Sequence, residues 1–570
     1  MGLSQWLSIP PLPSRESVVY NSTSINIEFE MDPSKCPNEN FLENSPNATS
    51  DPELEPASKN TPTISNAIAA TTTTSSSNPE TNDEPHLTRT LTPVSTVGLA
   101  FTITNTWMSY TATFGPSLAY GGVVTVLFGL IGAAIAQWAV LLGVCEILQV
   151  VERSGGCYAF TFALLPPKSK YRNPISFTVG MINLLGFWIG GVAAGIYTAQ
   201  SIFGLVGFWH GGFEPGKKRW EVYLGFVGVA LVSLLPTLTI PSSKIKYLTT
   251  ATLSLTLLVF ITIITVCSTH LHHDSSNGSN NQPQHYMNSR SAILTTHINT
   301  SGWPDSIAWL LSISLGMYSF SPTGTVVHIV EDVKETHGAK GAGWTVAMAI
   351  NRTMALGLAT GVSFITVLLL GIKNIEAVQE AYMPSLEAFN QGSGSMVIAT
   401  GLQSCLVVLF FTTVSTQWVS VSRIAWSLAR DNALPYSAYF SHISPAHNKP
   451  LRTTFLSAIF FIIFGVIYIA SSTAFNSVVN MATLLVNIAY AVPQGVLLFG
   501  GRGRLDELVA DDGGPESGVD GDGVKREVKR RFDLGKAGYI VNAFSVVWTV
   551  FVGVLFCFPT RIPTEAGRMN

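Results

Sequence analysis

Charged residues are scarce in this chain: only 12% of its 570 residues are Asp, Glu, Lys or Arg, whereas 47% are hydrophobic. Soluble domains carry about 25% charged residues. A soluble protein of this composition would need one very large apolar core, but single cores stop growing at roughly 250 to 300 residues. The excess apolar surface therefore has to face something other than water, and lipid is the simplest choice.

Cysteine is also rare, because the chain has six, scattered mostly within apolar runs and without the spacing of a disulfide framework or a zinc site. The net charge of −3 shows no basic excess of the kind that nucleic-acid binding requires. The run His270–Asp274 opens a polar segment that offers no rigid frame for a metal. We therefore expect no metal, no organic cofactor and no nucleic-acid partner.

The first 90 residues differ in composition from the rest. Between Asn40 and Asn82 the chain is rich in Ser, Thr, Asn and Pro. Such a segment cannot bury enough apolar surface to offset the entropy lost on ordering. We expect residues 1–90 to form a disordered tail, and we find no pattern of a signal peptide at its start.

Long apolar runs separated by short polar segments follow the tail. A helix needs about 17 to 25 residues to cross the hydrocarbon of a bilayer. The sequence predicts a transmembrane domain over residues 91–558, a loop insertion at 501–536 and a short tail at 559–570. Eleven crossings are predicted near residues 95–120, 123–150, 176–206, 221–240, 247–267, 306–330, 344–371, 395–428, 451–472, 475–500 and 538–558.

The distribution of basic residues predicts the orientation of these crossings. If the N-terminus is cytosolic, 25 of the 32 Lys and Arg residues fall on the cytosolic side and seven on the other. Positive residues collect on the cytosolic side of membrane proteins. We expect an integral membrane protein, in the plasma membrane, with its N-terminus in the cytosol.

Two of the predicted crossings contain polar interruptions. The first contains the polar stretch Thr102–Ser109, and the sixth contains Ser319–Gly324, where Pro322 removes a hydrogen-bond donor. Non-helical backbone survives at membrane depth only where it is buried or lines a cavity. Hydroxyl side chains within a crossing can also simply bond to their own helix or join two helices, and that alternative stays open.

The two interruptions occupy the first and the sixth crossings. If crossings 1–5 and 6–10 form two repeats, each interruption lies in the first helix of its repeat. Each repeat has an odd number of crossings, so the second repeat would be inverted relative to the first. An inverted pair of repeats with interrupted helices is the pattern of a transporter whose binding site lies near the middle of the membrane.

Three motifs carry a resemblance to a known family: Cys145–Ile147 with Arg153–Tyr158, Ser321–Asp332, and Ser422–Pro435. With them the chain resembles the amino acid-polyamine-organocation transporters, most of all the fungal amino acid, choline and GABA permeases. The resemblance implies an all-α polytopic membrane protein with a five-plus-five inverted-repeat, leucine-transporter-like core in which helices 1 and 6 are broken. Members of this family usually have twelve spans, whereas eleven are predicted here.

The resemblance implies that the substrate binds between the two broken helices, where helix ends offer N–H groups to a carboxylate and carbonyls to an ammonium. The substrate-binding candidates carried over by position are Thr104, Asn105, Thr106, Trp107, Phe320, Ser321, Thr323 and Gly324. Bulky Trp107 and Met108 stand where amino acid transporters of this family usually have small residues. Trp107, Tyr110, Phe114 and Phe320 could instead hold an amine by cation–π attraction.

The predicted function is therefore secondary active transport of a small amine-bearing solute, such as choline, GABA or an amino acid, by alternating access. The expected partners are that solute and the lipid bilayer, and the oligomeric state stays open. Two alternatives remain: a nutrient-sensing receptor that kept the fold without transport, and a membrane-embedded enzyme. Because no cluster of nucleophiles and His or Asp residues lies at one interface, we do not expect an enzyme.

Coupling to a proton or a sodium gradient is left open by the sequence. Glu146 lies within a predicted crossing and His328 titrates near neutrality, so either could carry a proton. For Glu146 we expect rather an ion pair with Arg153 or Arg423. Ser415 and Thr416 of the eighth crossing could bind sodium through their hydroxyls.

Overall fold

A computed structural model describes residues 89–210, 215–276, 294–295, 297–334, 341–444, 448–512, 532–559 and 561–562. The tail predicted at residues 1–90 lies outside the described residues except for its last two positions. Most of the 501–536 segment and most of the C-terminal tail also lie outside them. The boundaries of these segments therefore stay predictions.

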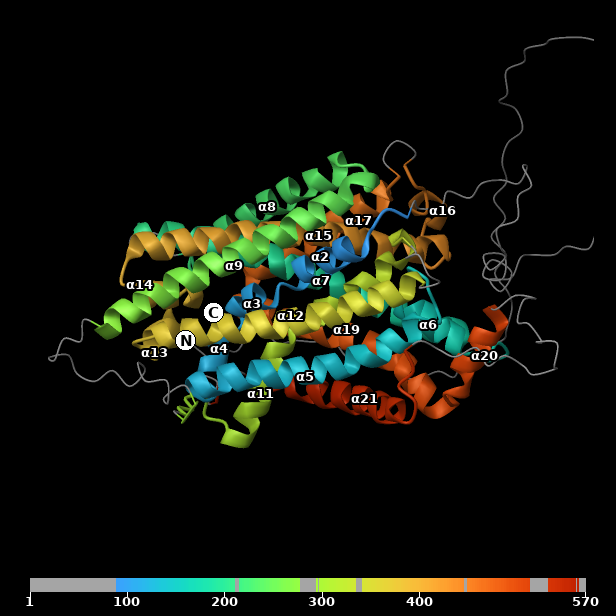
Figure 1. Ribbon diagram of the computed structural model, residues 1–570. Coiled ribbons are helices and arrows are strands. Elements are labelled where there is room, and N and C mark those ends of the chain that lie inside the picture. Colours follow the sequence, from blue (N-terminus) through green and yellow to red (C-terminus); the bar gives the residue numbers. More distant parts are fainter. Residues whose placement is uncertain are drawn as a thin grey trace, which may run out of the picture. The chain divides into compact units, whose positions relative to one another are not determined.

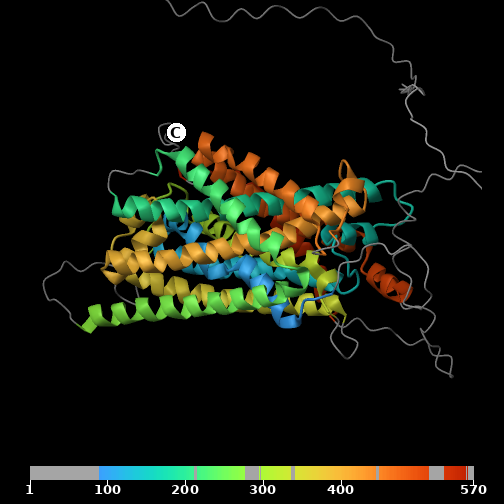
Figure 2. The same ribbon diagram turned by 90° about the horizontal axis from the view of Figure 1, so that it is seen from above.

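Nine helices in the described part of the chain are long and apolar enough to cross a membrane, and they run side by side (Figures 1 and 2). Apolar side chains such as Leu231, Leu235 and Ile540 remain exposed on their outer faces, as expected of helices that contact lipid. The nine are α5 (Gly122–Leu148), α7 (Arg172–Trp209), α8 (Arg219–Thr239), α9 (Ile245–Ser276), α12 (Ala342–Gly371), α15 (Met396–Arg430), α17 with α18 (Leu451–Gly465 and Ile467–Ala470), α19 (Ser472–Gly500) and α21 (Ala537–Leu555).

The extent of α9 corrects one expectation. The sequence placed the end of the fifth crossing near residue 267 and a loop from His270 onward. The helix instead continues to Ser276, because the residues after 267 include no Pro or Gly that would end it before that point.

The first crossing is broken at Asn105. Helix α2 (Pro93–Thr104) begins after Thr92, whose hydroxyl accepts a hydrogen bond from the Ser95 amide. It ends at Asn105, whose φ of 33° lies in the left-handed region that Asn tolerates better than most residues. The short segments α3 (Thr106–Ser109), η1 (Tyr110–Ala112) and α4 (Phe114–Leu118) complete the crossing.

The sixth crossing is broken as well. Helix α11 (Asp305–Met317) ends before a turn at residues 318–320, and η3 (Ser321–Asp332) then follows as a 3₁₀ helix of 12 residues with Pro322 in its first turn. Runs of 3₁₀ helix longer than three or four residues are uncommon and often mark a functional hinge. The predicted fold class, an all-α membrane protein with broken helices 1 and 6, is confirmed.

The second half of the core repeats the elements of the first half in inverted orientation. In the first half, the short helix α6 (Cys157–Leu164) separates the second and third crossings. In the second half, α13 (Ile375–Glu380) and α14 (Pro384–Ser393) take the corresponding place. Helices α6 and α14 lie at opposite ends of the bundle (Figure 1). We call these the α20 end, after α20 (Gly503–Asp512), and the α14 end.

Buried ion pairs join helices at the α20 end. Glu146, near the end of α5, pairs with Arg502 and also accepts a hydrogen bond of 3.2 Å from the Leu534 amide. The predicted partners of Glu146, Arg153 and Arg423, were therefore wrong. Arg502 falls within the predicted loop insertion at 501–536, but it follows closely after α19, which packs beside α5, and its side chain is buried.

Two further ion pairs tie η3 to α15. Asp332 pairs with Arg423, and both side chains are buried. Glu331 pairs with Arg430 at 3.0 Å in a more exposed position, and it also accepts a hydrogen bond of 2.9 Å from the Ser154 amide. Because the Leu91 amide bonds to the Asp332 carbonyl at 2.9 Å, the start of α2 is held against the end of η3.

Lys449 closes the end of α8. Its ammonium donates to the carbonyls of Thr237, at 2.7 Å, and of Ile240. Cations are favoured at this end of a helix dipole. Burial, together with the nearby positive charge of Arg423, nevertheless lowers the pKa of Lys449 from 10.5 to about 8.

This lowered pKa predicts a pH-dependent stability. The folded chain binds the Lys449 proton less tightly than the unfolded chain, so its stability should rise as the pH increases from about 8 to about 10.5. We expect the Tm of the purified protein to increase over this range. In Lys449→Met the increase should be smaller. An identical pH profile for both proteins would contradict the prediction.

Candidate functional site

The two helix breaks contact each other directly. The Thr104 hydroxyl, at the end of α2, donates to the Thr323 hydroxyl in η3 at 3.2 Å. The Thr106 hydroxyl, at the start of α3, donates to the Ser319 carbonyl at 3.2 Å. All four residues are buried. The polar backbone of each break is therefore covered by the other break rather than exposed to lipid.

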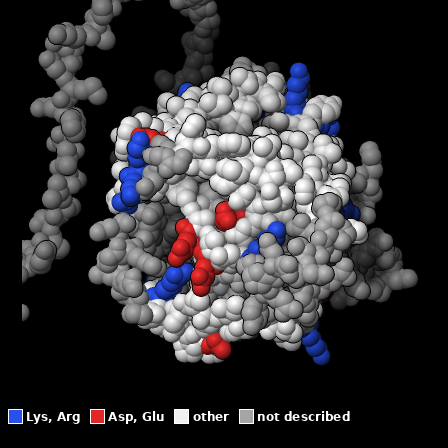
Figure 3. Space-filling view, turned by 90° about the vertical axis from the view of Figure 1, so that its left-hand side faces the viewer, with Lys and Arg blue, Asp and Glu red and all other residues white. Residues whose placement is uncertain are grey.

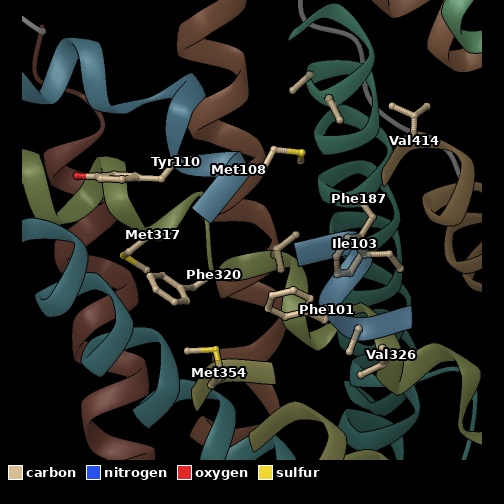
Figure 4. Packing of buried hydrophobic residues seen from close by; sticks show 14 of the residues in the cluster. Phe101, Ile103, Met108, Tyr110, Phe187, Met317, Phe320, Val326, Met354 and Val414 are labelled. Carbon is tan, nitrogen blue, oxygen red and sulfur yellow. The ribbon is translucent and has the colours of Figure 1, made fainter. Parts of the chain in front are cut away.

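A cavity lies beside this junction. Its volume is about 40 Å³, which is room for a few water molecules, so a solute would enter only as the surrounding side chains move apart. The lining comes from α2 and α3, from the turn at residues 318–320 and the start of η3, and from α7, α15 and α19. In Figure 4, Tyr110 and Phe320, which do not line the cavity, lie to the left of Met108, Ile103 and Phe187, which do.

The cavity is apolar with a few polar groups. None of the described residues that line it is Asp, Glu, Lys, Arg or His. Three aromatic residues line it, Phe187, Tyr318 and Phe410, and α7 contributes the small residues Gly186 and Gly190. An ammonium could therefore bind there through ring faces and backbone carbonyls without an ionised side chain.

Only some of the predicted site residues reach this cavity. Ser321 lines it, together with Pro322, and Ser321 donates to the Met317 carbonyl at 2.8 Å. Thr104, Thr106 and Thr323 join the two breaks instead.

Trp107 lies away from the cavity. Its ring packs against Phe260 of α9 and Phe364 of α12, with centroid distances of 5.6 and 5.1 Å. Phe320 lies beside Gly357 of α12, and neither residue lines the cavity.

The last two candidates also lie at the breaks. Asn105 forms the break in the first crossing, and its side-chain oxygen has no hydrogen-bond partner among the described residues. Gly324 lies against the Tyr490 hydroxyl, where a Cβ would collide with the ring. A role of these eight residues in binding stays a prediction.

The aromatic residues that line the cavity were missed from the sequence. Tyr110 and Phe114, proposed from the sequence, are buried and do not line it, and the Tyr110 hydroxyl donates to the Val126 carbonyl at 2.8 Å. Phe187, Tyr318 and Phe410 lie on three separate elements. No local pattern could have selected them, although Tyr318 directly precedes the predicted polar break.

The candidates for ion coupling have ordinary structural contacts. One ring nitrogen of His328 pairs with the Asn183 amide at 2.8 Å and the other with the Ser154 carbonyl at 2.9 Å. The hydroxyls of Ser415 and Thr416 each donate to carbonyls of their own helix at 3.0 Å. These contacts explain the residues as packing elements, and coupling stays a prediction.

A second hollow lies at the α14 end. Its volume is about 520 Å³, and it lies between the end of α7 and the start of α14. Lys217, Glu380 and Glu387 border it. Figure 3 shows this end of the molecule, where carboxylates gather around a hollow near its middle.

A layer of tyrosines lies between the two hollows. Along α7, Gly186 and Gly190 line the central cavity and Gly204 lines the outer hollow. Between these positions, Gln200 donates to the Tyr468 hydroxyl at 3.2 Å. That hydroxyl lies 3.4 Å from the hydroxyl of Tyr382. The ring of Tyr197 packs against that of Tyr318 with a centroid distance of 6.2 Å.

Comparison with known proteins gives consistent matches over the whole transmembrane part. Residues 91–570 match the amino acid permease family. The choline transporter of Saccharomyces cerevisiae is 26% identical over 491 residues, which cover 85% of this chain and 79% of that protein. The 7-keto 8-aminopelargonic acid transporter of the same yeast is 24% identical, covering 84% and 88%. Amino-acid permease 2 of Neurospora crassa is 24% identical, covering 92% and 91%.

Proposed function

Because the chain belongs to the amino acid permease family of membrane transporters, we propose that it carries a small amine-bearing solute across the membrane by secondary active transport. The main support is the cavity beside the junction of the two broken helices. The names of these relatives include choline, 7-keto 8-aminopelargonic acid and amino acids, and each of these compounds carries a nitrogen that is positively charged at neutral pH. We propose the same class, with choline, GABA and amino acids as candidates.

The lining of the cavity supports an ammonium as the anchoring group. Met108 occupies the wall next to the first break, so a carboxylate has little access to the amides at the start of α3. Three aromatic rings attract an ammonium by about 0.5 to 2 kcal/mol each, more when it is desolvated. The carbonyl ends of α2 and α11 add partial negative charge nearby.

Alternating access follows if the barriers on either side of the cavity open in turn. Toward the α14 end, the barrier is the layer of Tyr197, Tyr382 and Tyr468. Along α7, this layer lies between the levels of Gly190 and Gly204, which are about 21 Å apart. Toward the α20 end, α2 and η3 are held to each other and η3 is held to α15 by the Asp332–Arg423 pair.

We also propose an orientation and an energy source for transport. The α20 end faces the cytosol, since most basic residues fall on its side, and the protein lies in the plasma membrane. A proton or sodium gradient would drive the uptake.

Uptake by intact cells tests the proposed function. The chain would be expressed in yeast cells that lack their own amine permeases, and the uptake of labelled choline, GABA and amino acids would be measured. Thr323→Trp serves as the blocked control, because Thr323 is fully buried at the junction and an indole there would fill the space between the breaks. Surface labelling would show that both proteins reach the membrane.

We expect at least one of these solutes to enter faster with the wild-type chain than with Thr323→Trp. If none does, the proposed substrate class is wrong. Binding of a solute to the purified protein without any uptake would favour the receptor instead.

A further inference from the structure

Gln417 lies on the wall of the central cavity with an amide held in one orientation. It belongs to α15, is only 5% exposed, and lines the cavity. Its Nε2 donates to the Phe187 carbonyl of α7 at 3.1 Å. Because a carbonyl can only accept, this bond identifies the nitrogen and leaves the Oε1 atom at the other position of the amide.

The backbone of α7 makes room for this contact. A Cβ at Gly191 would lie 3.2 Å from the Gln417 nitrogen, and one at Gly190 would lie 3.9 Å away. A larger residue at position 191 would collide with the Phe461 ring and also press on the Gln417 nitrogen. The amide is therefore seated against α7 and does not simply extend into empty space.

The oxygen of this amide accepts no hydrogen bond from any described residue. The same is true of the hydroxyls of Tyr318 and Thr483, which line the cavity from the 318–320 turn and from α19. These three polar groups come from three elements that line the same cavity, so they are placed where a bound molecule could pair with them.

The aromatic rings by themselves do not select among amines. A ring face attracts a quaternary ammonium and a protonated amine alike, because the attraction depends on charge and not on N–H groups. An amide oxygen, in contrast, gains a hydrogen bond only from a group that carries a hydrogen. Gln417 is the strongest candidate for this discrimination, because its amide oxygen can only accept, whereas the Tyr318 and Thr483 hydroxyls can turn to donate instead.

We propose that Gln417 Oε1 accepts a hydrogen bond from the ammonium of the solute, and that the site consequently prefers protonated amines with at least one N–H over quaternary ammonium ions. This inference rests on the proposed function and specifies its substrate class. A site that is built to bond a hydrogen discriminates against analogues that lack it, since its own polar group is then left unpaired.

A methylation series separates this hydrogen bond from other interactions. Ethanolamine, N,N-dimethylethanolamine and choline keep the same hydroxyl and the same charge, but they carry three, one and no N–H hydrogens. Binding of each to the purified full-length protein would be measured as a ligand-dependent increase in Tm. We expect the two N–H amines to bind roughly 10-fold or more tightly than choline, as expected for a hydrogen bond from a charged donor.

Gln417→Leu should remove this preference. The affinities of N,N-dimethylethanolamine and choline should then lie within about twofold of each other. Gln403→Leu is the matched control, because it makes the same change on the same helix. The Gln403 oxygen accepts from Ser385 at 3.0 Å and the residue does not line the cavity. It should keep the preference even if its Tm is lower.

The outcomes distinguish the two proposals. If the amines bind but choline binds equally well, or if Gln417→Leu keeps the preference, the role of Gln417 is overturned while the proposed function stands. If none of the three compounds, nor GABA or an amino acid, shifts the Tm or enters cells, the proposed function itself fails, and the inference about Gln417 with it.

Discussion

Arg502→Met should lower the Tm of the purified protein by several degrees, one of the largest effects of any single substitution considered for this chain. The substitution removes the cation that pairs with Glu146, whose side chain is completely buried. Breaking a buried ion pair from one side costs about 3 to 5 kcal/mol, because a buried charge is left uncompensated. The loss can be measured as the Tm in detergent and as the fraction of monodisperse protein.

Arg504→Met provides the matched control. Arg504 lies two residues further along the chain and pairs with Glu507 at 2.7 Å, but the Glu507 side chain is 63% exposed. Exposed pairs contribute about 0 to 1 kcal/mol, so this variant should keep nearly the wild-type Tm. Adding Glu146→Gln to Arg502→Met should recover part of the loss. Equal losses in the two arginine variants would contradict a special role of the buried pair.

Gly190→Leu should abolish or strongly reduce uptake while the protein still folds. A Cβ at this position meets only the Gln417 nitrogen, at 3.9 Å, so the added side chain extends into the cavity. Competition for this space costs about 1 to 3 kcal/mol of binding free energy, which corresponds to a loss of roughly 5-fold to 150-fold in affinity. Concentration-dependent uptake in cells, normalised to surface protein, measures the effect.

The same change at Gly228 controls for the effect of a larger residue in a membrane helix. Gly228 lies on α8, where a Cβ would have no neighbour within 4 Å, and it does not line the cavity. Gly228→Leu should transport like the wild type. If Gly190→Leu also transports normally with unchanged affinity, the solute does not occupy this cavity.

The broken helices show how much a local pattern can predict. Polar residues in the middle of an apolar run, with a proline in the second case, were sufficient to locate the interruptions at Asn105 and before Ser321. The reason is that backbone groups in hydrocarbon must be paired, so a departure from helix requires residues that tolerate it. The extent of the break was less predictable, since only Asn105 separates α2 from α3.

The partner of Glu146 shows where local patterns fail. From the sequence, an ion pair was correctly predicted for Glu146, but the predicted cation was wrong. Arg502 is 356 positions away along the chain, and it was assigned to a charged loop because its sequence neighbours are polar. Its burial follows from the packing of α19 beside α5, which no property of residues 500–510 encodes.

The same division applies to the whole protein. Composition and hydropathy alone determined that the chain is a polytopic membrane protein, where its helices run and which two are interrupted, because the cost of exposing polar groups to lipid acts on each residue separately. Which side chains meet in the cavity was decided by the tertiary structure. Phe187, Tyr318 and Gln417 become neighbours only when α7, the sixth crossing and α15 pack together, and the choice of neighbours depends on shape complementarity between distant segments.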